Sequence, residues 1–521
     1  MKKMSRVTST DYLILGGCCS GLTSAISARE AGVKDVTVIE VRKIFGGSGR
    51  MQMSLAGVDT PYQRRHGVHV HADDFAKEVT HANHYMQNNK LIWEMFMDSS
   101  DRHAWLESLG VEWQDVRAMT GTRRVAHIHE TGTIGSMDTG VVIMDKLLEE
   151  IDRIGGVHLV NETRAKKLLQ DANGKVIGAQ VEDKDGKYDI KARAVLISTG
   201  SITGNKQLRQ ELFPEVNFDA DHMRIVSDLP WLQGEGYTMA QDIGCDKGIM
   251  GFHYYGPDAL TSNRGVMLLH RPEMMTVNKF GKRFINEDLS ATTDDHVIIG
   301  NALSREPDTT CYAIIDEEHI QEMMRLKIRI NGYEDNFAQT VNDDFAGNMN
   351  TDDPGAVKYF GNADVMSWMN DLPAHYKEQE EKFGTMKVCQ TLDEVADFIG
   401  CDHDVFKAQV ARMNRFAEEG FDAELGKQPK WLKSIRVAPF YVVRGVQGLD
   451  NINGGIAITD EFQVLRHKVP VEGLYATGNI ASGLVGAGTG GDGFCWAGPW
   501  AYFGGYKTGK TVAKAMAEGK L

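Results

Sequence analysis

The stretch Leu13–Ser24, LILGGCCSGLTS, places a glycine cluster and two adjacent cysteines directly after an apolar run. A glycine-rich turn that opens a helix lets the backbone approach a phosphate and offers amide groups to it. Two neighbouring thiols could instead form a redox pair. The stretch is therefore consistent with a dinucleotide site, a redox site or only a tight turn.

The elements expected around this turn favour the dinucleotide site. Residues 11–15 fit a buried strand, residues 21–31 (GLTSAISAREA) fit a helix, and residues 35–41 (DVTVIEV) fit a second strand. Glu40 follows Gly16 by 24 positions, close to the offset of about 20 at which an acidic side chain meets the ribose hydroxyls. Strand, turn, helix, strand and acid together form a βαβ dinucleotide fingerprint.

Cys18 makes the turn irregular, because it stands at the middle glycine place of GxGxxG while Gly16 and Gly21 hold the outer places. A cysteine fits there if its Cβ points away from the phosphates. A redox role for Cys18 and Cys19 is the alternative that would give these thiols a specific chemistry. Free cysteines are commonly buried and inert, so we favour two small thiols beside the cofactor.

Further glycine-rich segments indicate that the dinucleotide is FAD. Residues 43–55 (KIFGGSGRMQMSL) form a second glycine loop, which often passes the FAD pyrophosphate and flavin in flavoproteins with two dinucleotide folds. Residues 192–200 (ARAVLISTG) end in a Thr-Gly turn, and residues 473–493 contain GLYATGN and GLVGAGTGGDG. We therefore predict FAD, bound non-covalently. The predicted cofactor-binding residues are Gly16, Gly17, Cys18, Ser20, Gly21, Glu40, Val41, Gly46, Gly47, Ser48, Thr199, Gly200, Gly478, Asn479, Gly491, Asp492 and Gly493.

Length and composition fit a protein of two or three domains. The chain has 521 residues, 42% of them hydrophobic and 25% charged, with a formal net charge of −15. This charge disfavours binding to nucleic acids or anionic membranes. There is no apolar run of about 18 residues and no leader-like start, and the seven cysteines show no cluster or c-type haem spacing. We expect a cytoplasmic, reduced protein without membrane insertion.

Five motifs follow one another along the rest of the chain. They are GEGYTMAQDIGC at 234–245, VNKFGKRFINE at 277–287, PFYVVRG at 439–445, GGIAITDEFQVL at 454–465 and GLYATGN at 473–479. In this order they resemble the fumarate reductase/succinate dehydrogenase flavoprotein family, which includes 3-ketosteroid dehydrogenases and urocanate reductases. The resemblance implies an α/β fold in which a Rossmann-like FAD-binding domain of the two-dinucleotide type is interrupted by an α+β capping domain. It implies residues 1–250 and 436–521 for the two parts of the FAD-binding domain and residues 251–435 for the cap, with substrate held between cap and flavin.

The cationic clamp of the family's dicarboxylate reductases is missing. The family's His-Pro falls on Gly256-Pro257, and its His-His falls on Asp450-Asn451. The arginine expected within residues 291–295 is replaced by ATTDD, and the arginine of the glycine-dense loop falls near Thr489. A site with these replacements would repel a dicarboxylate, which argues against fumarate or succinate as substrate.

Neutral aromatic and polar residues stand near the lost clamp, in the segment GFHYYGP and at Asp450-Asn451. Aromatic side chains with a polar tip suit a flat ring, and a tyrosine can serve as a general acid. The predicted catalytic residues are His253, Tyr254, Tyr255, Asp450 and Asn451.

These residues predict an FAD-dependent reductase that acts on a carbon–carbon bond of a neutral, cyclic substrate, either an enone, a steroid or an isoflavonoid-type phenolic. Flavin N5 would give hydride and a Tyr or Asp acid the proton. An external donor would supply electrons, either NADH, reduced flavin or a partner flavoprotein. Two alternatives stay open. One is a 3-ketosteroid-like dehydrogenase that passes electrons outward, and the other is a catalytically silent FAD-binding sensor.

Two groups of histidines offer other chemistry. Alternate histidines in HGVHVH could converge on a metal, but a solvated surface is the favoured interpretation of His66, His69, His71, His81 and His84, and no metal is predicted. His127 and His129 are better candidates for a place near the substrate. The acid-rich segment 333–355 fits an exposed loop of the cap and lacks the spacing of a calcium loop.

Overall fold

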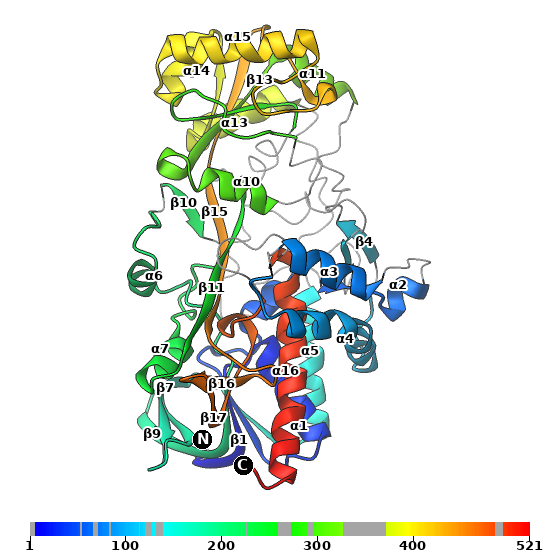
Figure 1. The fold of residues 1–521 in the computed structure, drawn as a ribbon, viewed down its shortest axis with the longest axis vertical. Coiled ribbons are helices and arrows are strands. Elements are labelled where there is room, and N and C mark those ends of the chain that lie inside the picture. Colours follow the sequence, from blue (N-terminus) through cyan, green and yellow to red (C-terminus); the bar gives the residue numbers. More distant parts are fainter. Residues whose placement is uncertain are drawn as a thin grey trace.

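The computed structural model describes residues 6–52, 55–65, 71–82, 85–113, 115–119, 127–131, 139–219, 221–225, 227–258, 272–288, 296–326, 371–484 and 493–521. The molecule is elongated, and each end is built around a β-sheet (Figure 1). Both termini lie at the lower end in this view. None of the helices in these ranges is long and apolar enough to cross a membrane.

The lower end contains an eight-stranded sheet with the order β16-β17-β9-β1-β2-β6, to which β8 adds through β9 and β7 through β8. The pairs among β17, β9, β1, β2 and β6 are parallel. Parallel sheets of this kind are covered on both faces. The strands are β1 (Ser9–Leu15), β2 (Val36–Ile39), β6 (Val157–Val160), β7 (Arg164–Gln170), β8 (Val176–Asp183), β9 (Gly186–Ile197), β16 (Gln463–Arg466) and β17 (Val469–Ala476).

Strand β1 shows how the sheet is buried. Tyr12 and Ile14 join the core cluster under the helices α1 (Cys19–Glu30), α5 (Thr139–Ile154) and α16 (Gly493–Ala517), while Leu13 and Leu15 face a second cluster beneath α7 (Glu235–Asp242). The alternation is that of a strand with two covered faces. The βαβ unit predicted from the sequence is confirmed, with the helix starting two residues earlier than expected.

The upper end contains a six-stranded sheet in the order β10-β15-β13-β12, with β11 and β14 also paired to β15. Its strands are β10 (Met223–Ile225), β11 (Lys247–Asp258), β12 (Met275–Asn278), β13 (Thr310–Asp316), β14 (Met386–Cys389) and β15 (Phe440–Ile456). Its helices are α10 (His296–Leu303), α11 (Glu317–Leu326), α13 (Leu372–Phe383), α14 (Leu392–Ile399) and α15 (His403–Glu419).

The antiparallel pair β11 and β15 runs side by side from the upper sheet down to the lower part of the molecule (Figure 1). Its lower end is tied to the lower part by the bridge between Ile456 and Ala481. The second sheet thus takes strands from both sides of residue 250, and the boundaries 251–435 for a cap stay a prediction.

A small sheet and several helices complete the described structure. The sheet has the order β3-β5-β4. These elements are β3 (Leu55–Gly57), α2 (Pro61–Arg65), α3 (Ala72–Ala82), α4 (Asn89–Ser108), β4 (Asp115–Met119), β5 (His127–Thr131) and α6 (Lys206–Leu212), with short 3₁₀ helices at Gly47–Met51, Pro307–Thr309, Pro429–Trp431 and Gly478–Ile480.

Candidate active site and cofactor site

The first glycine turn connects β1 to α1 so tightly that side chains would not fit. Gly16 has φ +110, and a Cβ there would lie 2.4 Å from the carbonyl oxygen of Ser198. A Cβ on Gly21 would lie 2.0 Å from the carbonyl oxygen of Gly16, and one on Gly17 would lie 2.3 Å from the ring of Phe45. Close backbone packing therefore requires glycine at positions 16 and 21, and the Phe45 ring leaves no room for a side chain at position 17.

The N-terminus of α1 is open to an anion. Cys18 is its N-cap residue, its side chain caps no amide of the helix, and the first turn carries no acidic residue. The uncapped amides and the positive end of the helix dipole favour a phosphate group. Ser20 lies buried in this turn, against Gly478.

Glu40 directly follows β2, at the place where the sequence predicts a contact with a ribose. Its carboxylate accepts hydrogen bonds from the amides of Gly17 and Arg42, both at 3.0 Å. Burial raises the pKa of Glu40, although these amides act in the opposite direction. Val41 is half-buried, and the Arg42 guanidinium lies 4.0 Å from the ring centre of Trp231. This arginine–tryptophan pair could not be inferred from the sequence.

The second glycine loop is fastened to the first. The amide of Gly46 donates to the carbonyl oxygen of Gly17 at 2.7 Å, and Gly46 has φ +109. Gly47 also has a positive φ, and Ser48 is half-buried. The predicted loop after β2 therefore lies beside the phosphate turn.

The remaining predicted cofactor residues lie at the ends of β9 and β17 and at the start of α16. Thr199 and Gly200 follow β9, and the preceding Ser198 donates its hydroxyl to the carbonyl oxygens of Leu15 and Gly16. Gly478 has φ +75 and its carbonyl oxygen accepts from Trp500 Nε1 at 3.2 Å, with the half-buried Asn479 next to it. Gly493 begins α16, whereas Gly491 and Asp492 lie outside the described residues. Ser198 was missed by the sequence reasoning, although it directly precedes the Thr-Gly turn.

This donor set fits the adenosine diphosphate part of FAD. A close glycine turn, an uncapped helix N-terminus and a buried carboxylate at the end of the next strand provide, in order, room for the pyrophosphate, amides for its charge and an acceptor for ribose hydroxyls.

A histidine–aspartate pair lies on the β11–β15 ladder. His253 Nδ1 and Asp450 Oδ2 are 3.2 Å apart, with 2% of the histidine side chain and 35% of the aspartate side chain exposed. His253 and Tyr254 pair with Asn451 and Leu449, so Asp450 is an extra, bulged residue of β15. A bulge turns a side chain out of the regular alternation, and here it aims the carboxylate at the histidine.

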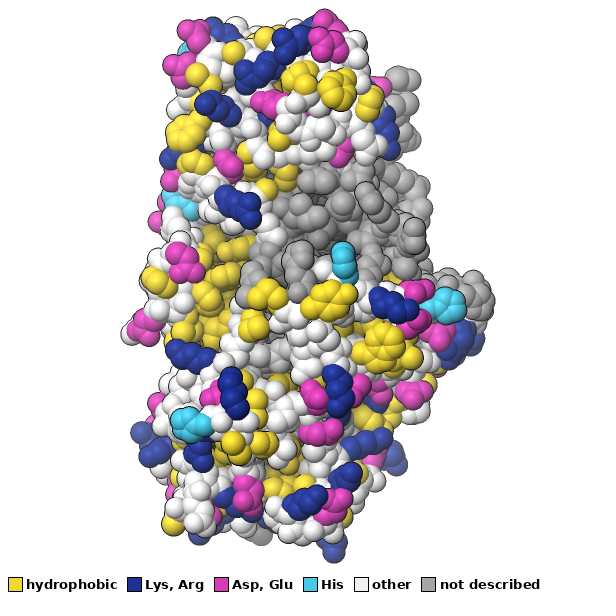
Figure 2. Space-filling view, viewed as in Figure 1, with side chains coloured by type: hydrophobic (Ala, Val, Ile, Leu, Met, Phe, Trp, Pro, Cys, Tyr) yellow, Lys and Arg dark blue, Asp and Glu magenta, His cyan; other side chains and the backbone are white. Residues whose placement is uncertain are grey.

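Tyr254 points to the other face of β11. Its side chain is 5% exposed, and its ring stacks on Phe252 with centroids 5.2 Å apart. Phe252 in turn contacts Phe213, in an apolar area that is visible beside α6 and β11 in Figure 2. Burial raises the pKa of Tyr254, and the charged group that acts on it is Glu215. The tyrosine thus packs in the core, away from Asp450, and the side chain of Tyr255 lies outside the described part of the chain.

Asn451 belongs to a buried hydrogen-bond network. Its Oδ1 accepts from the Thr203 hydroxyl at 2.8 Å and from the amide of Ile452 at 2.9 Å. Ser201 donates to the carbonyl oxygen of Ile452 at 2.6 Å. The network joins β15 to the segment that follows Thr199-Gly200, so Asn451 positions the strand that carries Asp450.

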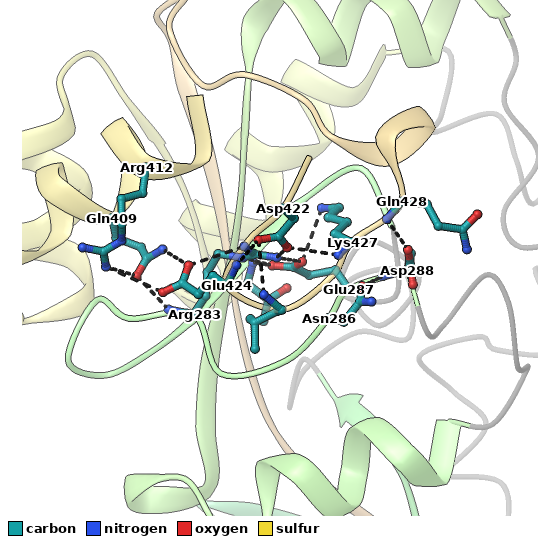
Figure 3. Close-up of polar contacts among 12 residues, drawn as sticks. Arg283, Asn286, Glu287, Asp288, Gln409, Arg412, Asp422, Glu424, Lys427 and Gln428 are labelled. Carbon is teal, nitrogen blue, oxygen red and sulfur yellow. Dashed lines mark hydrogen bonds and ion pairs between the residues drawn. The ribbon is translucent and has the colours of Figure 1, made fainter. Parts of the chain in front are cut away.

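The motif VNKFGKRFINE forms a buried charge cluster in the upper part (Figure 3). Arg283 Nη2 lies 2.7 Å from Glu287 and 3.0 Å from Asp422, and Lys427 Nζ lies 3.4 Å from Glu287. Burial opposes ionisation of Glu287, but the charges of Lys427 and Arg283 outweigh it and lower the pKa of this carboxyl. Asp288 extends the cluster by accepting from the amide of Gln428 at 2.6 Å. The residues expected to replace the family's arginine, 291–295, lie outside the described structure.

The structure describes the side chains of only two of the predicted histidines. His71 and His81 are exposed, and the side chains of His66, His69, His84, His127 and His129 are not described, as is also true of segment 333–355. Within the described ranges, no three His, Cys, Asp or Glu side chains gather as metal ligands.

Comparison with known proteins defines the class of protein. The family model for an FAD binding domain matches residues 11–493, so the chain belongs to this family of flavoproteins. It is an FAD-dependent oxidoreductase with a fold of the fumarate reductase type.

Two curated relatives are similar over nearly the whole chain. Identity to the vinyl phenol reductase of Lactiplantibacillus plantarum is 25% over 502 residues, which is 93% of this chain and 92% of that protein. Identity to the urocanate reductase of Eggerthella lenta is 22% over 490 residues, which is 92% of this chain and 71% of that protein. The solved 3-ketosteroid-Δ4-(5α)-dehydrogenase of Rhodococcus jostii RHA1, in complex with 4-androstene-3,17-dione, has the same fold, with a TM-score of 0.71 at 19% identity over 98% of both chains.

Proposed function

We propose that this oxidoreductase reduces a carbon–carbon double bond conjugated to a neutral ring, with a vinylphenol-type phenolic as the first candidate and cyclic enones, including steroids, next. The observation that carries the proposal is the His253–Asp450 pair on the β11–β15 ladder, where the family's dicarboxylate clamp would place cations. Two curated relatives, a vinyl phenol reductase and a urocanate reductase, are named for substrates with such a double bond.

Charge argues for a neutral substrate. Asp450 adds a carboxylate at the position where the clamp has a histidine, and it is partly open to solvent. A dicarboxylate would meet a like charge there, with a Coulomb repulsion of about 4 kcal/mol at 4 Å for an effective dielectric constant near 20. A phenol or ketone brings no such charge and can exchange hydrogen bonds with the pair.

The pair is suited to carry a proton. Bound FAD supplies hydride to one carbon of the double bond, and the chain must deliver a proton to the other. A carboxylate at hydrogen-bond distance fixes the orientation of an imidazole ring, and imidazole is the side chain most often used for proton transfer. We assign proton delivery to His253, with Asp450 holding the ring and exchanging protons with solvent. An external donor, either NADH, reduced flavin or a partner flavoprotein, restores the electrons.

Anaerobic stopped-flow spectroscopy tests the proposal. The FAD-loaded protein, reduced with dithionite, is mixed with 4-vinylphenol, urocanate, fumarate, a 3-ketosteroid or an isoflavone, and the return of oxidised-flavin absorbance is followed. Fast reoxidation by vinylphenol or another cyclic substrate, with fumarate inert, is the expected result. Reoxidation by fumarate would reject the charge argument. If none of these compounds reoxidises the flavin, the result would favour a dehydrogenase that passes electrons to an external acceptor, or an FAD-binding sensor.

Two variants test the roles of the pair. His253→Gln and Asp450→Asn should slow reoxidation by about 10²–10⁴-fold for a lost general acid, while FAD content is retained. His319→Gln is the matched control, because His319 forms a similar pair with Asp316 at 2.7 Å within the upper sheet. Equal rates in His253→Gln and the control would remove His253 from the reaction.

A further inference from the structure

Three sulfur atoms surround one point beside the second glycine loop. A Cβ built on Gly49 would lie 2.5 Å from Cys19 Sγ, 3.0 Å from Cys18 Sγ and 3.1 Å from Met144 Sδ. Glycine at position 49 leaves this space free of side-chain atoms. The two cysteines come from the start of α1 and the methionine from α5, so two helices and a loop converge there.

The spacing of the two cysteine sulfurs matches a metal with trigonal sulfur coordination. Cys18 Sγ and Cys19 Sγ are 3.8 Å apart. Metal–sulfur bonds of about 2.3 Å in a trigonal plane place sulfurs about 4 Å from one another. Thiolate and thioether ligands together select soft cations, above all Cu(I).

The surroundings of the thiols suit ligation. The amide of Gly49 donates to Cys18 Sγ at 3.1 Å, the kind of bond that supports a bound thiolate. Cys18 is half-buried and so within reach of solvent, whereas Cys19 and Met144 are buried.

We propose that Cys18, Cys19 and Met144 form a binding site for a soft, thiophilic cation of the Cu(I) class. On binding, two S–H bonds break, two metal–thiolate bonds and one metal–thioether bond form, and two protons leave to solvent. No electron is transferred. The proposal is independent of the reduction reaction, and it gives the two cysteines of the phosphate turn a chemistry of their own.

Competition titration tests the site on the full chain. FAD-loaded and FAD-free protein are titrated anaerobically with Cu(I) against a chromophoric chelator. We expect about one tightly held Cu(I) per chain, and copper X-ray absorption showing three sulfur neighbours at about 2.3 Å. Loss of this tightly held Cu(I) in the Cys18→Ser/Cys19→Ser variant supports the site. The same stoichiometry and affinity in that variant would overturn it.

Matched variants separate this site from the other thiols. Cys401→Ser removes another half-buried thiol, outside the phosphate turn, and should leave binding unchanged. Met144→Leu should reduce the sulfur count to two, and Gly49→Ala should block binding by filling the space between the sulfurs. Should the double serine variant not fold, mass spectrometry of alkylated wild-type protein decides the question. Protection of Cys18 and Cys19 by Cu(I) supports the site, and alkylation at an unchanged rate rejects it.

Discussion

The lower and upper sheets hold their key segments by different chemistry. At the ends of β1 and β2, glycines and main-chain groups shape the cofactor turn, and the one buried carboxylate, Glu40, is bound by amides. In the upper part, four charged side chains, those of Arg283, Glu287, Asp422 and Lys427, are buried together and hold the segment that follows β12.

This difference determines which kind of substitution destabilises each region. A site made of main-chain groups is disturbed by atoms that are added, because the backbone has no room to give. A buried charge cluster is disturbed by atoms that are removed, because each remaining charge loses its partner. The cofactor site should therefore be sensitive to small additions, whereas the cluster should be sensitive to the loss of any one of its charges.

The largest effect is expected from Gly16→Ala. The added methyl group would lie 2.4 Å from the Ser198 carbonyl oxygen, at a position with φ +110. We expect loss of bound FAD and a free energy of unfolding lower by about 1–3 kcal/mol for the overpacking alone. Gly32→Ala is the matched control, because Gly32 has φ +100 and open space around its Cβ position. Flavin absorbance and urea unfolding measure both variants, and FAD retention in Gly16→Ala at control level would contradict the close packing.

Arg283→Met should affect the cofactor less than Gly16→Ala does, but it should lower the free energy of unfolding more, in the upper part of the molecule. It leaves Glu287 and Asp422 without their shared cation, which costs about 3–5 kcal/mol for a broken buried pair. FAD content should stay normal, since the cluster lies in the other sheet. Hydrogen exchange should show β12 and α15 opening first.

An exposed arginine supplies the comparison for this variant. Arg436→Met removes a surface ion pair with Glu418, and such pairs contribute less than about 1 kcal/mol. Equal destabilisation by the two substitutions would mean that burial of the Arg283 cluster does not increase its contribution to the free energy of unfolding. Loss of FAD from Arg283→Met would mean that the two sheets are not independent.

Acid should weaken the two parts of the molecule in different pH windows. Burial lowers the pKa of His103, on α4 beside β3, from 6.5 to about 4. The unfolded chain therefore binds the proton more tightly, and about 3 kcal/mol of stability is lost as pH falls from 6.5 to 4. The pKa of Glu287 is lowered below 4.5, so its contribution is lost only as pH falls below that value. His103→Gln should flatten the first window in urea titrations and Glu287→Gln the second. A single shared window would contradict this division.

The elements that carry the predicted cofactor site were predictable from the sequence because their determinants are local. A strand, a glycine turn, a helix and a second strand within residues 9–39 follow from short-range patterns, and the structure confirms them. The hydrogen bond that holds the second glycine loop to Gly17 also spans only 29 positions, from Gly46 to Gly17.

The candidate catalytic pair was not predictable in the same way. His253 and Asp450 are separated by 197 positions, and their contact depends on the register of β11 against β15 and on one bulged residue. Local sequence does not reveal a bulge. The Arg283 cluster also needs tertiary structure, since its second carboxylate comes from Asp422. The sequence also did not reveal which residues of β11 point to which face of the sheet. This alternation decides which aromatic side chain enters the core.

The smallest effect is expected from Tyr254→Phe, which sharpens the assignment on β11. The ring packs on Phe252, and the variant keeps that contact while it removes only the hydroxyl. Burial raises the pKa of Tyr254, so the hydroxyl keeps its proton, and the charge that acts on it is that of Glu215. Single-turnover reoxidation should change by less than about twofold, corresponding to about 0.4 kcal/mol in the barrier. A loss as large as that of His253→Gln would return Tyr254 to the reaction, because the two side chains lie on opposite faces of one strand and cannot both line the same site.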